Sequence, residues 1–384
     1  MEKIKRLSEA DFDEIFALSE FAFQYKLTEE ELSKKKEEAK NHVIWGCMED
    51  NQLAAKLHLH TLECYIDGQP FEMGGIGAVA TWPEYRRKGH VRDLLEHALK
   101  YMKQEGQTLS FLHPFAFPFY RKFGWELTFV NKKYTIPMDK LKRPWNGDGY
   151  VERSDADIPL LQKIYTEYAK HFNGMLVRDE KWWKQRVLKD NYQIAVAYND
   201  KQQAEGYLLY MVKDDVFIIE ELVFNSLNAW KVLMQFTANH DSMATKIKYT
   251  VPENDLMPLF IAEPRFLQEI EPYFMARILD VPAFLQAYPY RGESKETVAI
   301  EVEDTFMEEN SGTYVIDTGR NTVKRSDSSI EKVYCTIQQL TVMLLGYKRP
   351  IDLYRAGLIE GDMKQVEALE KAIPNKQTFL ADFF

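Results

Sequence analysis

Residues 79–92 of the chain read VATWPEYRRKGHVR, and this stretch decides the fold. The apolar run that ends at Ala80 is typical of the end of a strand, and a proline and a basic loop follow it. Gly89 then opens a predicted helix, and Gly106 stands where a glycine commonly ends one. The apolar positions on one face of this helix are Val91, Leu94, Leu95, Ala98, Leu99 and Met102. A strand, a basic glycine loop and a helix N-terminus together predict a pyrophosphate site, because free amide N–H groups and the positive helix end face an anion.

The composition of the 384 residues is that of a globular protein, with 45% apolar and 28% charged residues. This length favours two or three domains. No apolar run approaches the roughly 20 residues of a membrane span, and the first residues do not resemble a signal peptide. The three cysteines, Cys47, Cys64 and Cys335, are scattered. We therefore expect a cytoplasmic protein without disulfides or a thiolate metal site.

The net charge of −10 argues against a nucleic-acid binder and is compatible with a cationic small-molecule substrate. His58 and His60 alternate along a predicted strand and face one side. We identify no carboxylate or thiol partner that would complete a metal site with them, so we expect a structural role for the pair and no metal.

The first part of the chain alternates helix and strand. Helices are expected over residues 7–23 and 28–40, the second opened by a capping box of Thr28 and Glu31. A hairpin follows over residues 42–66, then the strand that ends at Ala80 and the helix after Gly89. A short strand is expected over residues 108–113, and a last strand leads into Tyr134. Residues 140–150 carry Pro, Gly and Asn and predict a domain boundary.

Residues 151–288 repeat a similar order, but the loop before their second helix, Asn225-Ser226-Leu227-Asn228, has no glycine and no arginine. A second boundary is expected near residues 288–292, followed by strands and then helices. The predicted fold is mixed α+β, with domains over residues 1–145, 146–289 and 290–384. The chain ends in Phe383 and Phe384, and we expect this end to dock, because each exposed ring forfeits roughly 1.5–3 kcal/mol of burial.

The Arg-Arg-Lys-Gly loop is followed some thirty residues later by Tyr120-Arg121-Lys122-Phe123-Gly124-Trp125. Together these segments resemble the GNAT superfamily of acetyl-CoA-dependent N-acetyltransferases. Two GNAT-like units and a small domain with an aromatic carboxyl terminus resemble the enhanced intracellular survival (Eis) family. The third domain of that family resembles sterol carrier proteins, and residues 345–350 and 357–362 fit that pattern.

The resemblance implies acetyl-CoA as co-substrate and assigns roles to residues of the first domain and the terminus. Tyr120 matches the family's general acid, and the carboxylate of Phe384 matches its general base. Backbone groups on the strand edge would bind the pantetheine arm, residues of the loop would wrap the pyrophosphate, and two residues would lie near the thiol end. These residues are Val79, Ala80 and Thr81 for the arm, Arg87, Lys88, Gly89, His90, Val91 and Arg92 for the pyrophosphate, and Phe115 and Ala116 for the thiol end.

The chemistry would be direct attack of a primary amine on the thioester within a ternary complex. A tyrosine has a pKa near 10 and a thiol a pKa of roughly 8.5, so proton transfer from Tyr120 to the leaving sulfur is modestly uphill. An exposed α-carboxyl with a pKa of about 3.5 is a poor base for an alkylammonium with a pKa of about 10.4. Either burial raises the pKa of the Phe384 carboxyl, or the amine sheds its proton before binding and the carboxylate orients it.

The resemblance implies an aminoglycoside-like polyamine or a lysine side chain as acceptor, with Asp382 as the residue expected to select a cation, and it suggests a homohexamer. Two alternatives stay open. The chain is a lipid carrier that works through the third domain, or a scaffold that binds CoA without catalysis. In each case neither nucleic acid nor membrane is expected as a partner.

Overall fold

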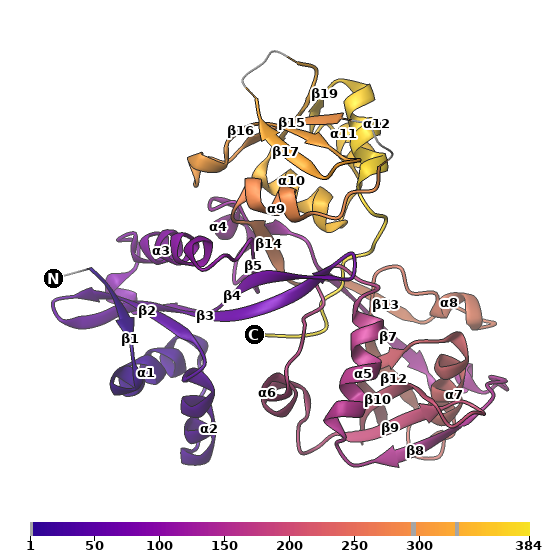
Figure 1. Cartoon of the computed structure of the whole chain (residues 1–384). Coiled ribbons are helices and arrows are strands. Elements are labelled where there is room, and N and C mark those ends of the chain that lie inside the picture. The colour runs from indigo at the N-terminus through magenta and orange to yellow at the C-terminus, as the bar shows by residue number, and fades with distance from the viewer. Residues whose placement is uncertain (1–2, 293–296, 327–329) are drawn as a thin grey trace.

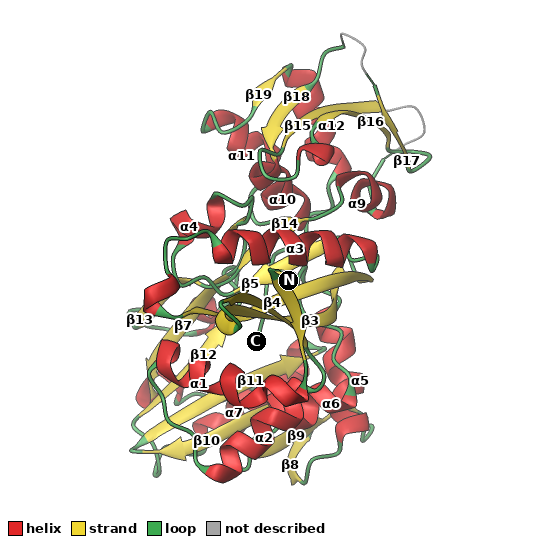
Figure 2. Cartoon of the chain, turned by 90° about the vertical axis from the view of Figure 1, so that its left-hand side faces the viewer, coloured by secondary structure: helices red, strands yellow, loops and turns green. Residues whose placement is uncertain are grey.

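The computed structural model describes residues 3–292, 297–326 and 330–384, which form three sheets (Figure 1). The first sheet has the strand order β1-β2-β3-β4-β5-β14-β6. Helices α1, α2, α3 and α4 accompany it, and α3 lies along one face (Figure 2). The strands are β1 Ile4–Leu7, β2 Val43–Glu49, β3 Gln52–Ile66, β4 Gln69–Thr81, β5 Leu109–Leu112, β6 Glu126–Leu127 and β14 Met275–Ile278; the helices are α1 Phe12–Phe23, α2 Glu29–Ala39, α3 His90–Gln104 and α4 Phe117–Arg121.

The second sheet has the order β13-β7-β12-β11-β10-β9-β8, and helices α5 to α8 belong to this part of the chain. Its strands are β7 Val130–Pro137, β8 Tyr150–Ser154, β9 Gln193–Tyr198, β10 Ala204–Lys213, β11 Val216–Phe224, β12 Lys246–Val251 and β13 Leu267–Pro272; its helices are α5 Ile158–Ala169, α6 Glu180–Trp182, α7 Leu227–Ala238 and α8 Met257–Phe260.

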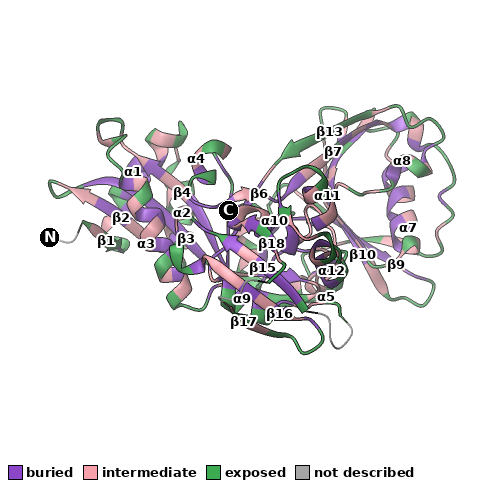
Figure 3. Cartoon of the chain, turned by 90° about the horizontal axis from the view of Figure 1, so that it is seen from above, coloured by how far each residue is buried: buried purple, intermediate pink, exposed green. Residues whose placement is uncertain are grey.

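The third sheet has the order β17-β16-β15-β18-β19. Its strands are β15 Thr297–Glu303, β16 Gly312–Asp317, β17 Thr322–Arg325, β18 Val333–Thr336 and β19 Glu360–Gly361; the helices of this part are α9 Val281–Ala287, α10 Ile337–Leu345, α11 Pro350–Arg355 and α12 Met363–Ala372. One continuous core joins it to the first sheet, with Phe111, Phe274, Ile300, Leu340 and Phe384 among its members. β3 and α10 are therefore largely buried, whereas β13 is an exposed edge (Figure 3).

The first two sheets exchange strands across the predicted boundary at residues 145 and 146. β7, the strand expected to lead into Tyr134, pairs with β12 and β13 of the second sheet. β14 returns from the second part of the chain and pairs with β5 and β6 of the first sheet. Local sequence patterns do not specify such pairings, because they depend on contacts between residues far apart in the chain.

The predicted helix over residues 7–23 is wrong at its start. Ile4–Leu7 is strand β1, paired with β2, and a short 3-10 turn after Ser8 precedes α1. The capping box of Thr28 and Glu31 is confirmed, with the Glu31 N–H donating to Thr28 Oγ1 at 3.3 Å and the Thr28 N–H donating to Glu31 at 2.8 Å.

A fork in the first sheet positions the candidate site. β4 and β5 run parallel from the Met73–Leu109 pair to the Ile76–Leu112 pair. β5 ends there, whereas β4 continues to Thr81. The register between β3 and β4 shifts just beyond the fork, where Ala78 has φ +49°, so β4 contains a bulge at this point.

Candidate active site

The basic loop and the start of α3 leave a helix N-terminus open. Gly89 precedes the first helical residue, His90, with φ +87°, and no side chain caps the helix there. A Cβ on Gly89 would meet no atom of the described residues within 4 Å, so there is open space beside the helix start. The first N–H groups of an α-helix have no acceptor within the helix. Arg86, Arg87 and Arg92 are exposed around this opening, and the arrangement suits a bound anion.

The side chains of Lys88 and His90 have other partners. Lys88 Nζ lies 2.7 Å and His90 Nε2 lies 2.8 Å from the Glu49 carboxylate of β2. Hydrogen bonds from Lys88 and His90 lower the pKa of Glu49. His90 is buried, with its Nδ1 3.1 Å from the sulfur of Cys47. These two side chains therefore fasten the loop to β2, and the three arginines and the backbone N–H groups remain for an anion.

Beyond the fork, Val79, Ala80 and Thr81 form the last residues of β4. Ala80 and Thr81 pair with β3 on one side, while β5 has ended on the other. The hydroxyl oxygen of Thr81 is buried without a hydrogen-bond partner. Lys56 Nζ donates to the carbonyl of Ala78 at 2.9 Å and so holds the bulge.

Tyr120 lies on the α3 side of the fork. Its ring is buried and belongs to one packed cluster with Ile76 and Leu112, the last paired residues of β4 and β5. Phe115 and Phe119 both contact it in T-shaped geometry, at ring centroid distances of 5.5 and 5.1 Å. Burial raises the pKa of Tyr120 well above its usual value near 10, so its hydroxyl keeps the proton throughout the physiological range.

Phe115 and Ala116 lie beyond the end of β5, before α4. Ala116 is the N-cap residue of α4, whereas the Phe115 side chain is 72% exposed. The Phe115 ring packs against Phe119 and Tyr120, at ring centroid distances of 5.1 and 5.5 Å.

The terminal Phe384 lies on the other face of β4. A Cβ on Gly75 would lie 2.6 Å from the Phe384 ring, and a Cβ on Gly77 would lie 3.4 Å from its carboxyl carbon. Successive residues of a strand point to opposite faces, so the Gly75 and Gly77 face is opposite to that of Ile76. Tyr120 and the terminal carboxylate therefore flank the fork from opposite sides of the sheet. Figure 1 shows this terminus between the first and second sheets.

Sequence reasoning missed the glycines that make room for this terminus. Gly75 and Gly77 stand within strand β4, and glycine in a strand interior often marks the close approach of another segment. That signal was present in the sequence, but nothing in it identified the terminus as the approaching segment.

The tail is anchored by a buried ion-pair cluster. Arg178 Nε lies 3.0 Å from Asp382, and its Nη2 lies 2.6 Å from Glu221. Trp182 Nε1 donates to Asp382 at 2.7 Å. Arg178 carries one positive charge and faces two carboxylates, Asp382 and Glu221, so it does not neutralise both. That Asp382 selects a cationic substrate stays a prediction. The next residue, Phe383, is half exposed, so only the final ring of the pair is buried.

Basic side chains of β3 line the face that carries the terminus. Lys56, His58 and His60 are all buried on this strand. His58 Nε2 lies 3.2 Å from Lys56 Nζ, and His58 Nδ1 lies 3.2 Å from His42 Nδ1. Burial lowers the pKa of Lys56 to about 7, that of His42 to about 4, and those of His58 and His60 well below 6.5. The imidazoles beside the terminal carboxylate are therefore neutral at pH 7.

A cavity of about 650 Å³ lies beside the tail. Its walls include Asp382 and Phe383, but its lining residues do not include Tyr120 or Phe384. The charged lining residues are of both signs: Glu38, Glu220, Glu221, Asp255, Glu269 and Asp382 against Lys35, Lys133, Arg178, Arg186, Lys189 and Lys248. The cavity adjoins the terminus, and its charges are balanced.

Neither a membrane-crossing helix nor a metal-binding group is found in the described part of the chain. No helix there is long and apolar enough to cross a bilayer. The same residues hold no group of three or more His, Cys, Asp or Glu side chains placed to bind a metal ion.

Comparisons with known proteins agree with this architecture. Residues 3–128 and 174–278 match acetyltransferase (GNAT) domain families, and residues 281–381 match a sterol carrier protein domain. An uncharacterized N-acetyltransferase of Streptomyces griseus is 24% identical over 270 residues, which is 62% of this chain and 64% of that protein. The match thus spans less than two thirds of the length of this curated relative.

Solved structures extend the likeness to the whole chain. A conserved Enterococcus faecalis protein of unknown function, described as a probable N-acyltransferase, is 26% identical with a TM-score of 0.93 over 99% of both chains. Eis1 from Mycobacterium abscessus shares the fold, with 20% identity and a TM-score of 0.84 over 100% of both chains. The chain therefore belongs to the GNAT superfamily of acetyltransferases, with two GNAT domains and a sterol-carrier domain arranged as in Eis proteins.

Proposed function

We propose that the protein transfers an acetyl group from acetyl-CoA to a primary amine. The observation that carries the proposal is the pair of groups on either side of the fork: Tyr120 on one face of β4, and the carboxylate of Phe384 against Gly77 on the other. A direct transfer needs an acid near the leaving sulfur and a carboxylate near the attacking nitrogen. Both groups belong to the first domain and the tail, so each chain holds one such centre.

The residues present fit acetyl-CoA. The uncapped start of α3 and its three arginines suit the pyrophosphate, and the free edge of β4 suits the amides of the pantetheine arm. The unpartnered hydroxyl of Thr81 lies on this edge. Acetyl-CoA supplies the activated acetyl group as a thioester. The fit rests on backbone groups and arginines, because Lys88 and His90 are engaged by Glu49.

The Phe384 carboxylate and Tyr120 would then accept and donate the protons that the reaction moves. The Phe384 carboxylate accepts the amine proton or orients a neutral amine, and its imidazole neighbours carry no charge that would pair with it. Tyr120 donates a proton toward the sulfur. Its raised pKa makes this transfer more strongly uphill than in water, unless the same desolvation also raises the pKa of the thiol. Backbone N–H groups of Val79 to Thr81 would polarise the carbonyl.

The acceptor class is an aminoglycoside, a polyamine or a lysine-like amine. The cavity beside the tail gives such a molecule room next to the terminus. We assign the cation to carboxylates in the walls of this cavity, namely Asp382, Glu220, Asp255 and Glu269. A homohexamer stays an expectation from the family resemblance.

A coupled assay tests the function. Purified protein is mixed with acetyl-CoA and a panel of polyamines, aminoglycosides and lysine peptides, and free thiol is followed. Amine-dependent thiol release is expected, with acetylated product identified by mass spectrometry. Thiol release no faster than hydrolysis with every amine would contradict the proposal. A non-catalytic CoA-binding scaffold would bind acetyl-CoA in calorimetry yet give no product.

A lipid-carrier function is less well supported. The apolar side chains of β15 and β16 pack with α10 and Phe384 into the core shared with the first sheet. Lipid recovered from the purified protein by mass spectrometry, without a thermal shift on adding CoA, would favour the carrier instead.

A further inference from the structure

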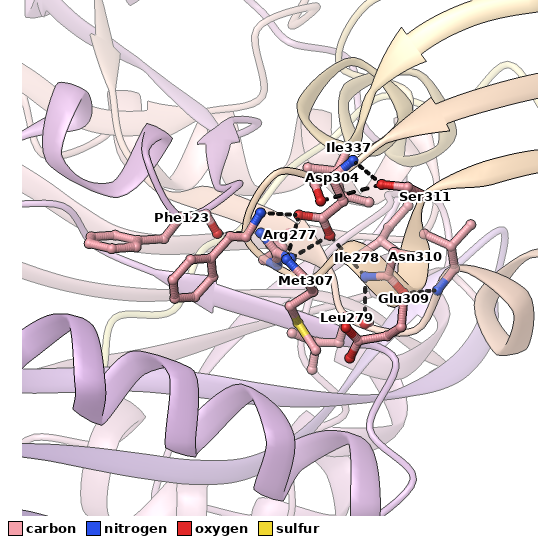
Figure 4. A network of polar contacts seen from close by, with 12 residues as sticks. Phe123, Arg277, Ile278, Leu279, Asp304, Met307, Glu309, Asn310, Ser311 and Ile337 are labelled. Carbon is pink, nitrogen blue, oxygen red and sulfur yellow. Dashed lines mark hydrogen bonds and ion pairs between the residues drawn. The ribbon is translucent and has the colours of Figure 1, made fainter.

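A buried ion pair joins the third domain to the first sheet. Arg277 of β14 and Asp304, which follows β15, have 0% and 1% of their side chains exposed, and their charged atoms lie 2.6 Å apart. The second oxygen of Asp304 accepts the N–H groups of Phe306 and Met307, both at 3.1 Å. Asn310 also donates to Asp304, at 2.9 Å (Figure 4). The carboxylate is thus fixed by its own domain and presented to Arg277.

Arg277, held by Asp304, also binds the segment that follows α4. Its Nη1 donates to the carbonyl of Phe123 (Figure 4). The next residue, Gly124, has φ +87°, and a Cβ there would overlap the guanidinium group. A second contact comes from α10, where Gln338 donates to the carbonyl of Arg121 at 3.0 Å. The third domain therefore holds the end of α4 directly through Gln338 and indirectly through the pair of Asp304 and Arg277.

The segment after α4 is hydrogen-bonded to Tyr120. The N–H groups of Phe123 and Trp125 donate to the Tyr120 carbonyl at 2.9 and 3.4 Å. The Trp125 ring is near both Arg277 and Tyr120: its centroid lies 5.7 Å from the guanidinium carbon of Arg277 and 6.3 Å from the centroid of the Tyr120 ring. Contacts therefore run without a gap from Asp304 to Tyr120.

The segment needs such support because α4 is short. It spans only Phe117–Arg121, and a helix of five residues is not stable by itself. Proton transfer depends on close placement of the donor, and small displacements of a catalytic group are costly. A buried ion pair contributes little net stability compared with an apolar pair of the same size, so its value here lies in geometry.

We propose that Arg277 and Asp304 are positioning residues through which the sterol-carrier-like domain holds Tyr120 in place for acetyl transfer. The inference rests on the proposed function of Tyr120. It gives the third domain a second task in the reaction, besides supplying the terminal carboxylate.

The test is a double-mutant cycle. The variant R277M/D304L removes both charges together, so that neither remains buried without a partner, and it is made with and without Y120F. We expect R277M/D304L to lower kcat about 10- to 100-fold, with KM for the amine and Kd for acetyl-CoA changed less than about 3-fold. In the Y120F background we expect no further loss. An equal loss in both backgrounds, or none in either, would overturn the proposal.

Two further variants serve as comparison and control. Gln338→Leu keeps the ion pair and should lower kcat in the same direction by a smaller factor. Arg291→Met removes another ion pair between distant parts of the chain, 2.8 Å to Asp67, that does not contact α4, and it should leave kcat unchanged.

Hydrogen exchange provides a readout that does not depend on turnover. Amides of residues 117–125 should exchange faster in R277M/D304L, while those of α3 keep the wild-type rate. Unchanged exchange over residues 117–125 would overturn the proposal, and so would the same acceleration throughout the chain. A wild-type protein with no amine-dependent activity would instead contradict the proposed function.

Discussion

Two helices of this chain begin after a strand in corresponding places, and only one of them begins with an open N-terminus. In the first domain, Gly89 precedes α3 with φ +87° and offers no cap. In the second, the hydroxyl of Ser226 accepts the N–H of Ala229 at 3.0 Å and donates to Glu205 at 2.6 Å. One helix end is left for a ligand, whereas the other is satisfied by the protein itself.

The difference explains why only the first of the two GNAT domains has a candidate anion site at this helix start. The N–H groups at a helix start need an acceptor, and a serine provides it at almost no cost. Once a side-chain cap and a neighbouring carboxylate are in place, an anion finds fewer free donors and a less favourable field. The strands of the two domains also differ, since β3 buries the basic side chains of Lys56 and His58, whereas Leu208 and Leu209 are among the buried residues of β10.

The largest effect is expected from displacing the terminal carboxylate, which lies against Gly77 of the first domain. Deleting Phe384 leaves the terminal carboxylate on Phe383, one residue short of this position, and should lower kcat by about 10³-fold, within the range of a lost proton-transfer group. Kd for acetyl-CoA should change less than about 3-fold, because the anion site lies at α3. Steady-state kinetics and calorimetry measure the two effects. Phe383→Ala is the matched control, because it removes an aromatic ring but keeps the carboxylate; equal losses in both variants would exclude this role of the carboxylate.

Closing the open helix end should make the first domain resemble the second. Gly89→Asp places a carboxylate at the anion site, and we expect acetyl-CoA affinity to fall on the order of 100-fold, since hydrogen bonds to a charged group are lost. Gly106→Asp is the control, because this glycine at the other end of α3 also has a positive φ and open space around it. If both variants bind acetyl-CoA equally well in calorimetry, the ligand does not bind at the start of α3.

The buried lysine of β3 should make stability depend on pH. Burial lowers the pKa of Lys56 to about 7 from 10.5, so between these values the unfolded chain binds a proton that the folded chain does not. The free energy of unfolding should therefore rise with pH across this range, by up to about 1.4 kcal/mol per unit. Lys56→Met should lose this slope in urea titrations. The control Lys100→Met, on the exposed face of α3, should retain it; an identical slope in all three proteins would show that Lys56 keeps an ordinary pKa.

The smallest effect is expected from removing the side-chain cap of α7 in the second domain. Ser226→Ala removes its cap and should cost about 1 kcal/mol of stability, measured by chemical unfolding. Acetyl-CoA should still bind at one site per chain, because the loop before α7 has no arginines. A second bound acetyl-CoA in calorimetry would show that the serine cap alone suppresses the second site.

Much of the local structure could be predicted, because it depends on neighbours in the sequence. The helix after Gly89 was predicted from its apolar spacing, and the structure confirms it as α3. The hairpin of β2 and β3 and the capping box at Thr28 are confirmed for the same reason. Ile4–Leu7 was missed because it becomes a strand only by pairing with β2.

The sequence by itself determined the open helix start, its missing counterpart in the second domain and the candidate acid and terminal carboxylate. Only the tertiary structure decided what surrounds them: the exchange of β7 and β14, the docking of Phe384 on Gly75 and Gly77, and the pairing of Asp382 with Arg178. The physical reason is the separation along the sequence between the groups that interact. Helix ends and turns are satisfied within a few residues, whereas a buried charge finds its partner some 200 residues away along the chain, as the separation of 204 between Arg178 and Asp382 shows.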